Sequence, residues 1–385
     1  MNGSLKNINQ LLSNTSYPED AFFIDKEFSK SSVILYGAGE SSHWFVEIVM
    51  KIHGYIPSVV LDRQFKPGDQ YEGVPAFSPL DYLPTDDEKE NSIVVICSGK
   101  PEYSEEIYNC LKGLGFRNII LLKDIYEVHN PFSQPEQLQK QGFNFYLNQK
   151  EQILSAFDLF GDEESEEVFQ CFLQTHMQRK PTSIPMRPRE EQYFPKDIDL
   201  AQGYSNFISC GAYDGDTVRL LNKTHGKVGN IVCFEAELAI FNRLSGYLQK
   251  NKSSLADNII ALPCAVYSHD VMMSFTSATG LGSRISVDGD SMVQCVALDH
   301  ILPDFKPSII SMDIEGAEPQ ALKGAEKMIR KYRPDLAICV YHAPNHLWDI
   351  PLYLHGLGLG YRFYLRNYTS FAIETVLYAT IEKNT

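Results

Sequence analysis

Apolar residues along this chain occur in short runs separated by segments with helical spacing. In the C-terminal half the runs lie at 207–210, 231–234, 308–312 and 336–341, followed by two runs with alternating apolar positions at 360–366 and 374–380. Short apolar runs that alternate with helices are typical of a parallel sheet, whereas the two alternating runs suit an antiparallel ending. With a third strand expected before the glycine-rich loop at 279–284, the pattern predicts a Rossmann-like α/β domain with a seven-stranded sheet over residues 201–385.

The N-terminal part shows the same alternation on a smaller scale. Apolar runs lie at 33–36, 59–62, 93–97 and 115–122, and helical spacing occurs at 43–53 and 103–114. A smaller Rossmann-like α/β domain is therefore predicted over residues 1–130. Residues 131–200 are predicted to be a helical linker region, because an acidic segment at 162–167 precedes apolar residues at helical spacing.

Composition narrows the class of protein and its partners. The chain is 44% hydrophobic and has a formal net charge of −15, so nucleic acid and anionic membrane surfaces would repel it. No apolar run reaches the ~18 residues of a membrane-spanning helix, so no membrane insertion is expected. The eight cysteines include no Cys-x-x-Cys pair, which fits a reducing cytoplasm better than a disulfide or zinc framework. Whether the protein forms a homo-oligomer is left open.

A glycine turn follows the run at 207–210. Gly211 and Gly215 are four residues apart and directly precede a segment with helical spacing, so the backbone can turn tightly and approach a ligand. Glu235 ends the next strand, where a carboxylate can accept hydrogen bonds from a ribose diol. This arrangement predicts a nucleoside cofactor site. Two further candidates for it lie within the turn: Tyr213 and Asp214.

A second group of candidates follows the later strands. Asp313 and Glu315 come directly after the run at 308–312, at the edge where open α/β sheets bind their ligands. They could contact the cofactor, an acceptor or a divalent cation. His342 ends the next strand, and because imidazole titrates near neutral pH it is the first candidate for a general base. His346 is four residues away, but Pro344 between them argues against a helical zinc pair.

These segments resemble the FkbM family of O-methyltransferases. The resemblance covers roughly residues 190–380 and rests on Cys-Phe-Glu-Ala-Glu at 233–237, Ala-Leu-Asp-His-Ile at 297–301, Met-Asp-Ile-Glu-Gly-Ala-Glu at 312–318 and Leu-Lys-Gly-Ala at 322–325. The family's pattern has Asp two residues before the first glycine of the turn. This chain has Ser209 there, which leaves its cofactor affinity open.

The resemblance implies a class I methyltransferase fold for residues 201–385 and S-adenosyl-L-methionine (SAM) as the cofactor. It also implies methyl transfer to a hydroxyl of a sugar or natural-product acceptor. Under this interpretation, Gly211, Tyr213, Asp214, Gly215, Glu235 and Asp313 bind the cofactor, and His342, Asp313 and Glu315 act in catalysis. Methyl transfer does not require a metal, and no metal ligand is assigned. The fold does not identify the acceptor.

Two other functions are compatible with the sequence. The chain could be a catalytically silent binding or scaffold protein that keeps the fold, which Ser209 favours. It could also be a nicotinamide-dependent sugar oxidoreductase that uses the N-terminal domain. The turn at 37–42 has two of the three glycines of the dinucleotide fingerprint, and Asp62 follows where a ribose ligand is wanted.

Overall fold

The computed structural model describes residues 3–19, 21, 23–29, 31–39, 42–43, 45–50, 54–97, 101–122, 125, 136–179, 184–276, 284–285, 289, 291–369 and 374–382. The chain forms two compact units. One contains Met1–Thr15, Ser133–Leu173 and Ser183–Thr385, and the other contains Ser16–Phe132 and Gln174–Thr182. No helix in the described ranges has the length and hydropathy that crossing a membrane requires.

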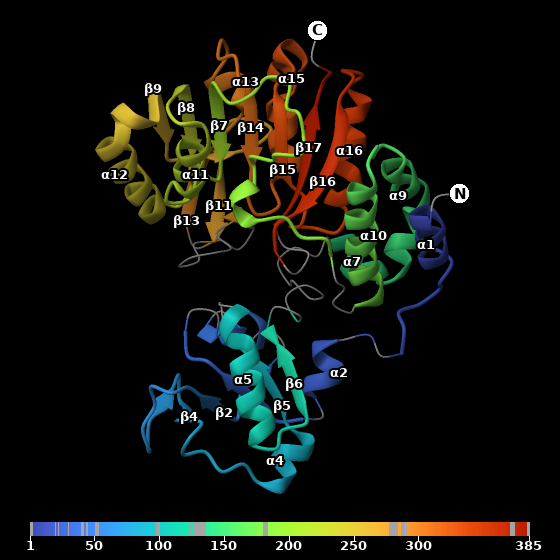
Figure 1. Cartoon of the computed structure of the whole chain (residues 1–385), viewed down its shortest axis with the longest axis vertical. Helices are drawn as coiled ribbons and strands as arrows, with labels where there is room; N and C mark the ends of the chain where they lie inside the picture. Colours follow the sequence, from blue (N-terminus) through green and yellow to red (C-terminus); the bar gives the residue numbers. More distant parts are fainter. Residues whose placement is uncertain are drawn as a thin grey trace. The chain divides into compact units, whose positions relative to one another are not determined.

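The first unit is built on a seven-stranded sheet (Figure 1) with the strand order β16-β17-β15-β14-β7-β8-β9. Its strands are β7 (Asn206–Cys210), β8 (Val228–Phe234), β9 (Ala256–Leu262), β14 (Ile309–Met312), β15 (Asp335–Cys339), β16 (Arg362–Asn367) and β17 (Thr375–Thr380). All pairs are parallel except β15–β17 and β16–β17, which are antiparallel. The predicted seven-stranded Rossmann-like sheet is confirmed.

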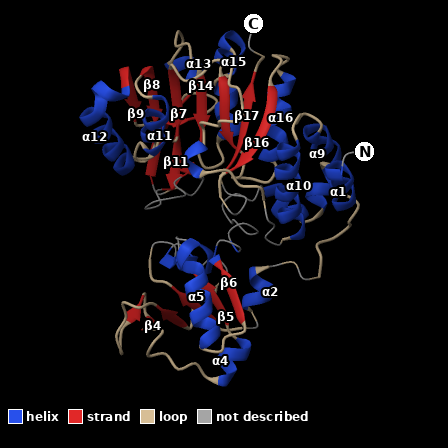
Figure 2. Ribbon diagram, viewed as in Figure 1, coloured by secondary structure: helices blue, strands red, loops and turns tan. Residues whose placement is uncertain are grey.

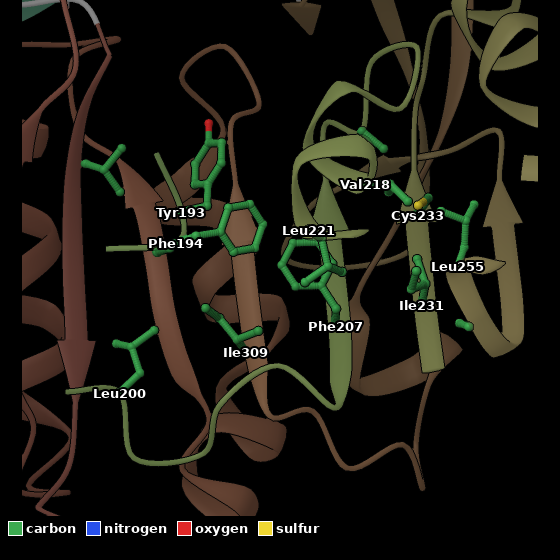
Figure 3. Packing of buried hydrophobic residues seen from close by; sticks show 14 of the residues in the cluster. Tyr193, Phe194, Leu200, Phe207, Val218, Leu221, Ile231, Cys233, Leu255 and Ile309 are labelled. Carbon is green, nitrogen blue, oxygen red and sulfur yellow. The ribbon is translucent and has the colours of Figure 1, made fainter. Parts of the chain in front are cut away.

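Helices flank this sheet, as Figure 2 shows. They are α11 (Asp216–His225), α12 (Leu238–Leu255), α13 (Leu298–Ile301), α14 (Glu318–Gly324), α15 (Glu326–Tyr332) and α16 (His346–Gly356). The core beneath them is apolar: Phe194 stacks on Phe207 with ring centroids 6.1 Å apart, and Figure 3 shows Leu221 beside this pair. Full burial of such side chains contributes about 1.5–3 kcal/mol each.

A small four-stranded sheet, which the sequence analysis did not predict, lies in the same unit. Its order is β10-β13-β11-β12, formed by Ala265–Val266, Ser291–Val296, Val271–Thr276 and Arg284–Ile285. Its strands are short or half-exposed: Met272 and Met292 are 51% and 57% exposed. Phe275 and Cys295 are buried, but most other side chains of these strands are half-buried or exposed, so the hydrophobic alternation that identifies a strand in a sequence is weak.

The helices before the sheet also belong to this unit. They are α1 (Gly3–Leu11), α7 (Glu136–Gln141), α8 (Asn144–Asn148), α9 (Lys150–Phe157) and residues 163–173 of α10 (Glu163–Gln178). Trp348 of α16 is fully buried against Phe145 and Tyr146, and its Nε1 donates a hydrogen bond to Gln149 Oε1 at 2.9 Å. Residues 133–173, predicted as part of a linker region, therefore pack onto the unit that contains the seven-stranded sheet.

The second unit is a smaller α/β domain, as predicted, with the strand order β3-β4-β2-β1-β5-β6. The strands are Gln70–Tyr71, Val74–Phe77, Val59–Leu61, Val33–Tyr36, Ile93–Ile96 and Asn118–Leu121, and the helices are α2 (Ile24–Phe28), α4 (Asp86–Asn91) and α5 (Pro101–Gly113). Within the expected helix at 43–53, residues Phe45–Met50 form a π-helical segment. Asp62 Oδ2 accepts a hydrogen bond from Ala38 N at 2.9 Å, while Glu40 and Ser41 of the glycine turn lie outside the described residues.

A buried arginine joins three segments of the first unit. Arg366 of β16 is 4% exposed. Its Nε donates to Asp197 Oδ2 at 2.7 Å, and its guanidinium also donates to Asp162 Oδ1 at 3.2 Å and Ser165 Oγ at 3.0 Å. Asp162 and Ser165 lie at the start of α10, and Asp197 lies in the segment before β7, so this one side chain fixes the helical segment to the sheet.

We expect Arg366→Met to lower the free energy of unfolding by about 1.5–3 kcal/mol, because the partly exposed carboxylates of Asp162 and Asp197 lose charge-assisted hydrogen bonds from a buried guanidinium. Arg362→Met on the same strand is the matched control. Arg362 pairs with Glu382 at the surface, where both side chains are more than half exposed, and the loss there should be about 0–1 kcal/mol. Urea unfolding measures both, and equal losses would show that the buried arginine has no special role.

Candidate active site

A cavity opens at the carboxyl edge of the seven-stranded sheet. Its wall contains residues that follow four neighbouring strands: Gly211 directly after β7, Glu235 directly after β8, Asp313 directly after β14, and Tyr341 two positions after β15. Parallel strands bring their carboxyl ends to one edge, so residues distant in the sequence meet there. The wall also contains Glu315, Tyr213 and Asp216, and Arg189 is the basic residue among those that line it.

The glycine turn has its predicted shape, but its two glycines serve different contacts. Gly211 has φ +77°, and a Cβ there would lie 1.9 Å from the carbonyl oxygen of Asp313. Gly215 has φ +94° and precedes α11, and a Cβ there would lie 2.8 Å from the ring of Tyr247 on α12. Gly211 therefore lines the cavity, whereas Gly215 allows the two helices to approach each other and is not part of the wall.

Glu235 holds a fixed orientation at the cavity wall. Its Oε2 accepts a hydrogen bond from Tyr213 N at 3.0 Å, and its Oε1 accepts one from Glu237 N at 2.9 Å. The residue is 9% exposed, and burial raises its pKa even though these hydrogen bonds oppose the shift. Asp214, by contrast, pairs with Arg219 and does not line the cavity.

Asp313 receives hydrogen bonds from two tyrosines. Tyr193 OH donates to Oδ2 at 2.9 Å and Tyr341 OH donates to Oδ1 at 3.1 Å. Burial alone would raise the pKa of Asp313, but the interaction with His342 and these hydrogen bonds lower it. Tyr193 precedes β7 by more than ten residues in a loop, and nothing in the sequence pattern indicated that it reaches the site. The carboxylate is therefore ionised and fixed in position.

His342 is buried among carboxylates. Its Nε2 lies 3.3 Å from Asp313 Oδ1 and 3.5 Å from Glu315 Oε2, and its Nδ1 lies 2.8 Å from Glu318 Oε1. Burial would lower its pKa, but Glu318, Glu315 and Asp313 outweigh that effect and raise it well above the ordinary value. A protonated imidazole cannot accept a proton, so this environment does not favour the predicted role of His342 as a general base at neutral pH.

Ser209, which stands where the resembled family has Asp, lies inside the sheet. It is 1% exposed within β7, in register with Ser311 of β14 and Cys233 of β8. It does not line the cavity. The cavity wall is therefore formed by residues that follow the strands, and the side chain at position 209 is not part of it.

Glu374 is an acidic residue of the wall that the sequence analysis did not single out. It directly precedes β17, and Val340 N donates to the neighbouring Thr375 carbonyl at 3.0 Å, which places Glu374 at the carboxyl edge. Burial and the charge of Asp313 raise its pKa to about 7, although Gln192 Nε2 donates to it and Arg189 lies 3.6 Å away. Because β17 runs antiparallel to β15, the start of β17 lies at the same edge of the sheet as the carboxyl ends of the parallel strands. Glu374, just before β17, therefore lies near the residues that follow those strands.

The raised pKa of Glu374 predicts a pH dependence of stability. Between its ordinary pKa of 4.5 and its folded pKa of about 7, the folded chain binds more protons at this group than the unfolded chain does. The contribution to stability is therefore fully present below pH 4.5 and is lost as pH rises to 7. Glu374→Gln should remove this loss in urea unfolding measured from pH 4 to pH 8. The exposed Glu190→Gln should keep the wild-type profile, and a Glu374→Gln profile identical to wild type would contradict the assignment.

Comparison with known proteins agrees with this geometry. Residues 209–363 match the family model of the methyltransferase FkbM domain. The crystal structure of methyltransferase FkbM from Methylobacillus flagellatus aligns over 98% of both chains, with a TM-score of 0.73 and 18% sequence identity. Aeropyrum pernix fibrillarin with bound S-adenosyl-L-methionine aligns over 49% of this chain and 72% of its own, with 11% identity and a TM-score of 0.32. No curated protein matches the chain. Residues 209–363 are therefore similar to the methyltransferase FkbM domain, and the chain has the fold of the Methylobacillus protein.

Proposed function

We propose that the chain is a SAM-dependent O-methyltransferase whose acceptor is a hydroxyl of a sugar or natural product. The observation that carries this proposal is the Glu235 carboxylate, which two backbone N–H groups orient at the wall of the cavity. A carboxylate at the end of the second strand of a Rossmann-like sheet is suited to accept hydrogen bonds from the two ribose hydroxyls of a nucleoside.

The rest of the cavity fits the other parts of SAM. Beyond Glu235 the wall is apolar, which suits an adenine ring; it includes Ile240, Ala265, Val266 and Phe275. The part near the glycine turn is acidic, with Asp216 and Asp313. SAM carries a sulfonium and an ammonium, and an acidic wall favours such a cation over a neutral or anionic nucleoside.

The remaining wall residues are placed to orient an acceptor. SAM supplies a methyl group on a sulfonium, which a hydroxyl oxygen attacks in line. Asp313 is held by Tyr193 and Tyr341, so it can orient the acceptor hydroxyl without moving. We assign the proton acceptor to Glu374, because a carboxylate with a pKa of about 7 can take a proton near neutral pH.

Binding of SAM tests the proposal before any acceptor is known. Glu235→Ala should weaken SAM binding in calorimetry by about 1.5–3 kcal/mol, which is about 10- to 150-fold in Kd, because the ribose hydroxyls lose a charged acceptor. Glu237→Ala is the matched control, since this neighbouring carboxylate does not line the cavity. Absence of SAM binding at millimolar concentration would favour a silent binding protein, and binding of NADH by the wild type would favour an oxidoreductase.

The role of Glu374 can be tested once a screen of nucleotide sugars finds an acceptor. Glu374→Gln should lower kcat by about 10²–10⁴-fold, the usual range for a general base. Its affinity for SAM should change little, because the amide keeps the shape of the side chain. The wild-type rate should rise with pH through about 7 and then level off. A variant that keeps the wild-type rate and pH profile would mean that the proton leaves to another group.

A further inference from the structure

A buried cluster of acidic and imidazole side chains lies behind the acceptor end of the cavity, and the methyl transfer proposed above does not use all of it. Glu318, the first residue of α14, is fully buried. His342 is 2% exposed and His346, at the start of α16, is 5% exposed. Of this cluster, Asp313 and Glu315 line the cavity. The cluster therefore connects the interior of the sheet unit with the site.

The side chains of the cluster approach one another without aligned hydrogen bonds. His342 Nδ1 lies 2.8 Å from Glu318 Oε1, and His346 Nδ1 lies 3.5 Å from Glu318 Oε2. Nevertheless, both ring nitrogens of His342, Nδ1 of His346 and Oε2 of Glu318 have no hydrogen-bond partner of acceptable geometry among the described residues. Buried polar atoms are normally satisfied, so several such atoms in one place require an explanation.

A cation at the centre of the cluster explains this geometry. A metal ion is bound through lone pairs on carboxylate oxygens and on a ring nitrogen, so the ligands converge on the ion and need no N–H directed at an oxygen. Asp313, Glu318 and His342 each offer one such atom, and the three atoms lie within 4.8 Å of one another. Asp313 and Glu318 share a single imidazole, and a divalent cation that displaces the imidazole proton offsets more of their negative charge than that proton does.

We propose that Asp313, Glu318 and His342 form a binding site for one divalent transition-metal ion. An imidazole nitrogen with two carboxylates suits Mn²⁺, Fe²⁺, Co²⁺ or Zn²⁺, whereas Mg²⁺ and Ca²⁺ prefer oxygen ligands alone. His342 and His346 are not brought together by helical spacing, because α16 begins only at His346. Instead, Glu318 lies between them and contacts both rings.

The position of the site indicates what the ion would do. Asp313 lines the cavity, so a coordination position of the ion can face an acceptor there. A metal ion in that position polarises a bound hydroxyl and lowers its pKa. The site is independent of Glu235, and metal binding is therefore expected whether or not the proposed cofactor is correct.

Metal binding by the full-length chain is the direct test. Protein stripped with a chelator is titrated with Mn²⁺, and the bound ion is followed by electron paramagnetic resonance. We expect one saturable site per chain and a nitrogen coupling from the imidazole ligand. His342→Ala and Asp313→Asn should each weaken binding by at least about 10–100-fold, since even partners of metal ligands have effects of that size.

His300→Ala is the matched control, because His300 forms an exposed pair with Asp270 at 3.2 Å and belongs to no group of three metal-ligand side chains among the described residues. It should leave Mn²⁺ affinity unchanged, and Glu235→Ala should lose SAM affinity while it keeps the metal. No saturable Mn²⁺, Co²⁺ or Zn²⁺ binding by the wild type would overturn the proposal, as would a bound Mn²⁺ without nitrogen coupling. The coupling is measured on the wild type, so the test stands even if a variant fails to fold.

Discussion

The close approach of β7 and β14 at their carboxyl ends is the constraint on which the site depends. At Gly211 the chain passes so near the Asp313 carbonyl that a Cβ would lie 1.9 Å from it. Asp313 N donates to Cys210 O at 3.0 Å and continues the parallel ladder past the end of β14. Any side chain at position 211 would push these segments apart. The turn that carries Tyr213 and the turn that carries Asp313 share one wall only because this position is glycine.

Charge is the second organising feature of the site. Asp313, Glu315 and Glu374 are half-buried in the cavity wall and Glu318 is fully buried, so each negative charge is costly. The protein reduces this cost in different ways. Tyrosine hydroxyls and His342 keep Asp313 ionised, whereas Glu374 has a pKa of about 7 and is partly protonated near neutral pH. Such a site favours cations, which is consistent with the proposed sulfonium cofactor and the proposed metal ion.

The sequence predicted the sheet well because a buried parallel strand leaves a clear apolar run. It also located Glu235, Asp313 and Glu315 at the cavity, since residues that end such strands must lie at the carboxyl edge. It did not indicate Tyr193 or Glu374. Tyr193 reaches Asp313 from a loop 120 positions earlier in the chain. Glu374 precedes an antiparallel strand. The position of both residues at the carboxyl edge of the sheet therefore follows from the tertiary path of the chain, which the local hydrophobic pattern does not show.

The charged environment of His342 could not be predicted from the sequence either, because it is formed by residues of other elements. Histidine at the end of a strand suggests a neutral base, but the contacts of its ring come from Glu318 on α14 and from Asp313 after β14. Three carboxylates around one imidazole reverse the expected direction of its pKa shift. Glu318 is the first residue of α14. In the structure its Oε1 accepts a hydrogen bond from Ile314 N at 2.9 Å, and it also contacts both histidines.

A crystal structure of the full-length chain with SAM tests the account most directly. The account predicts that both ribose hydroxyls lie within hydrogen-bonding distance of Glu235, with the adenine against Ile240 and Val266 and the methyl group toward Asp313 and Glu374. A nucleoside bound with its ribose away from Glu235, or bound only in the N-terminal unit, would contradict it.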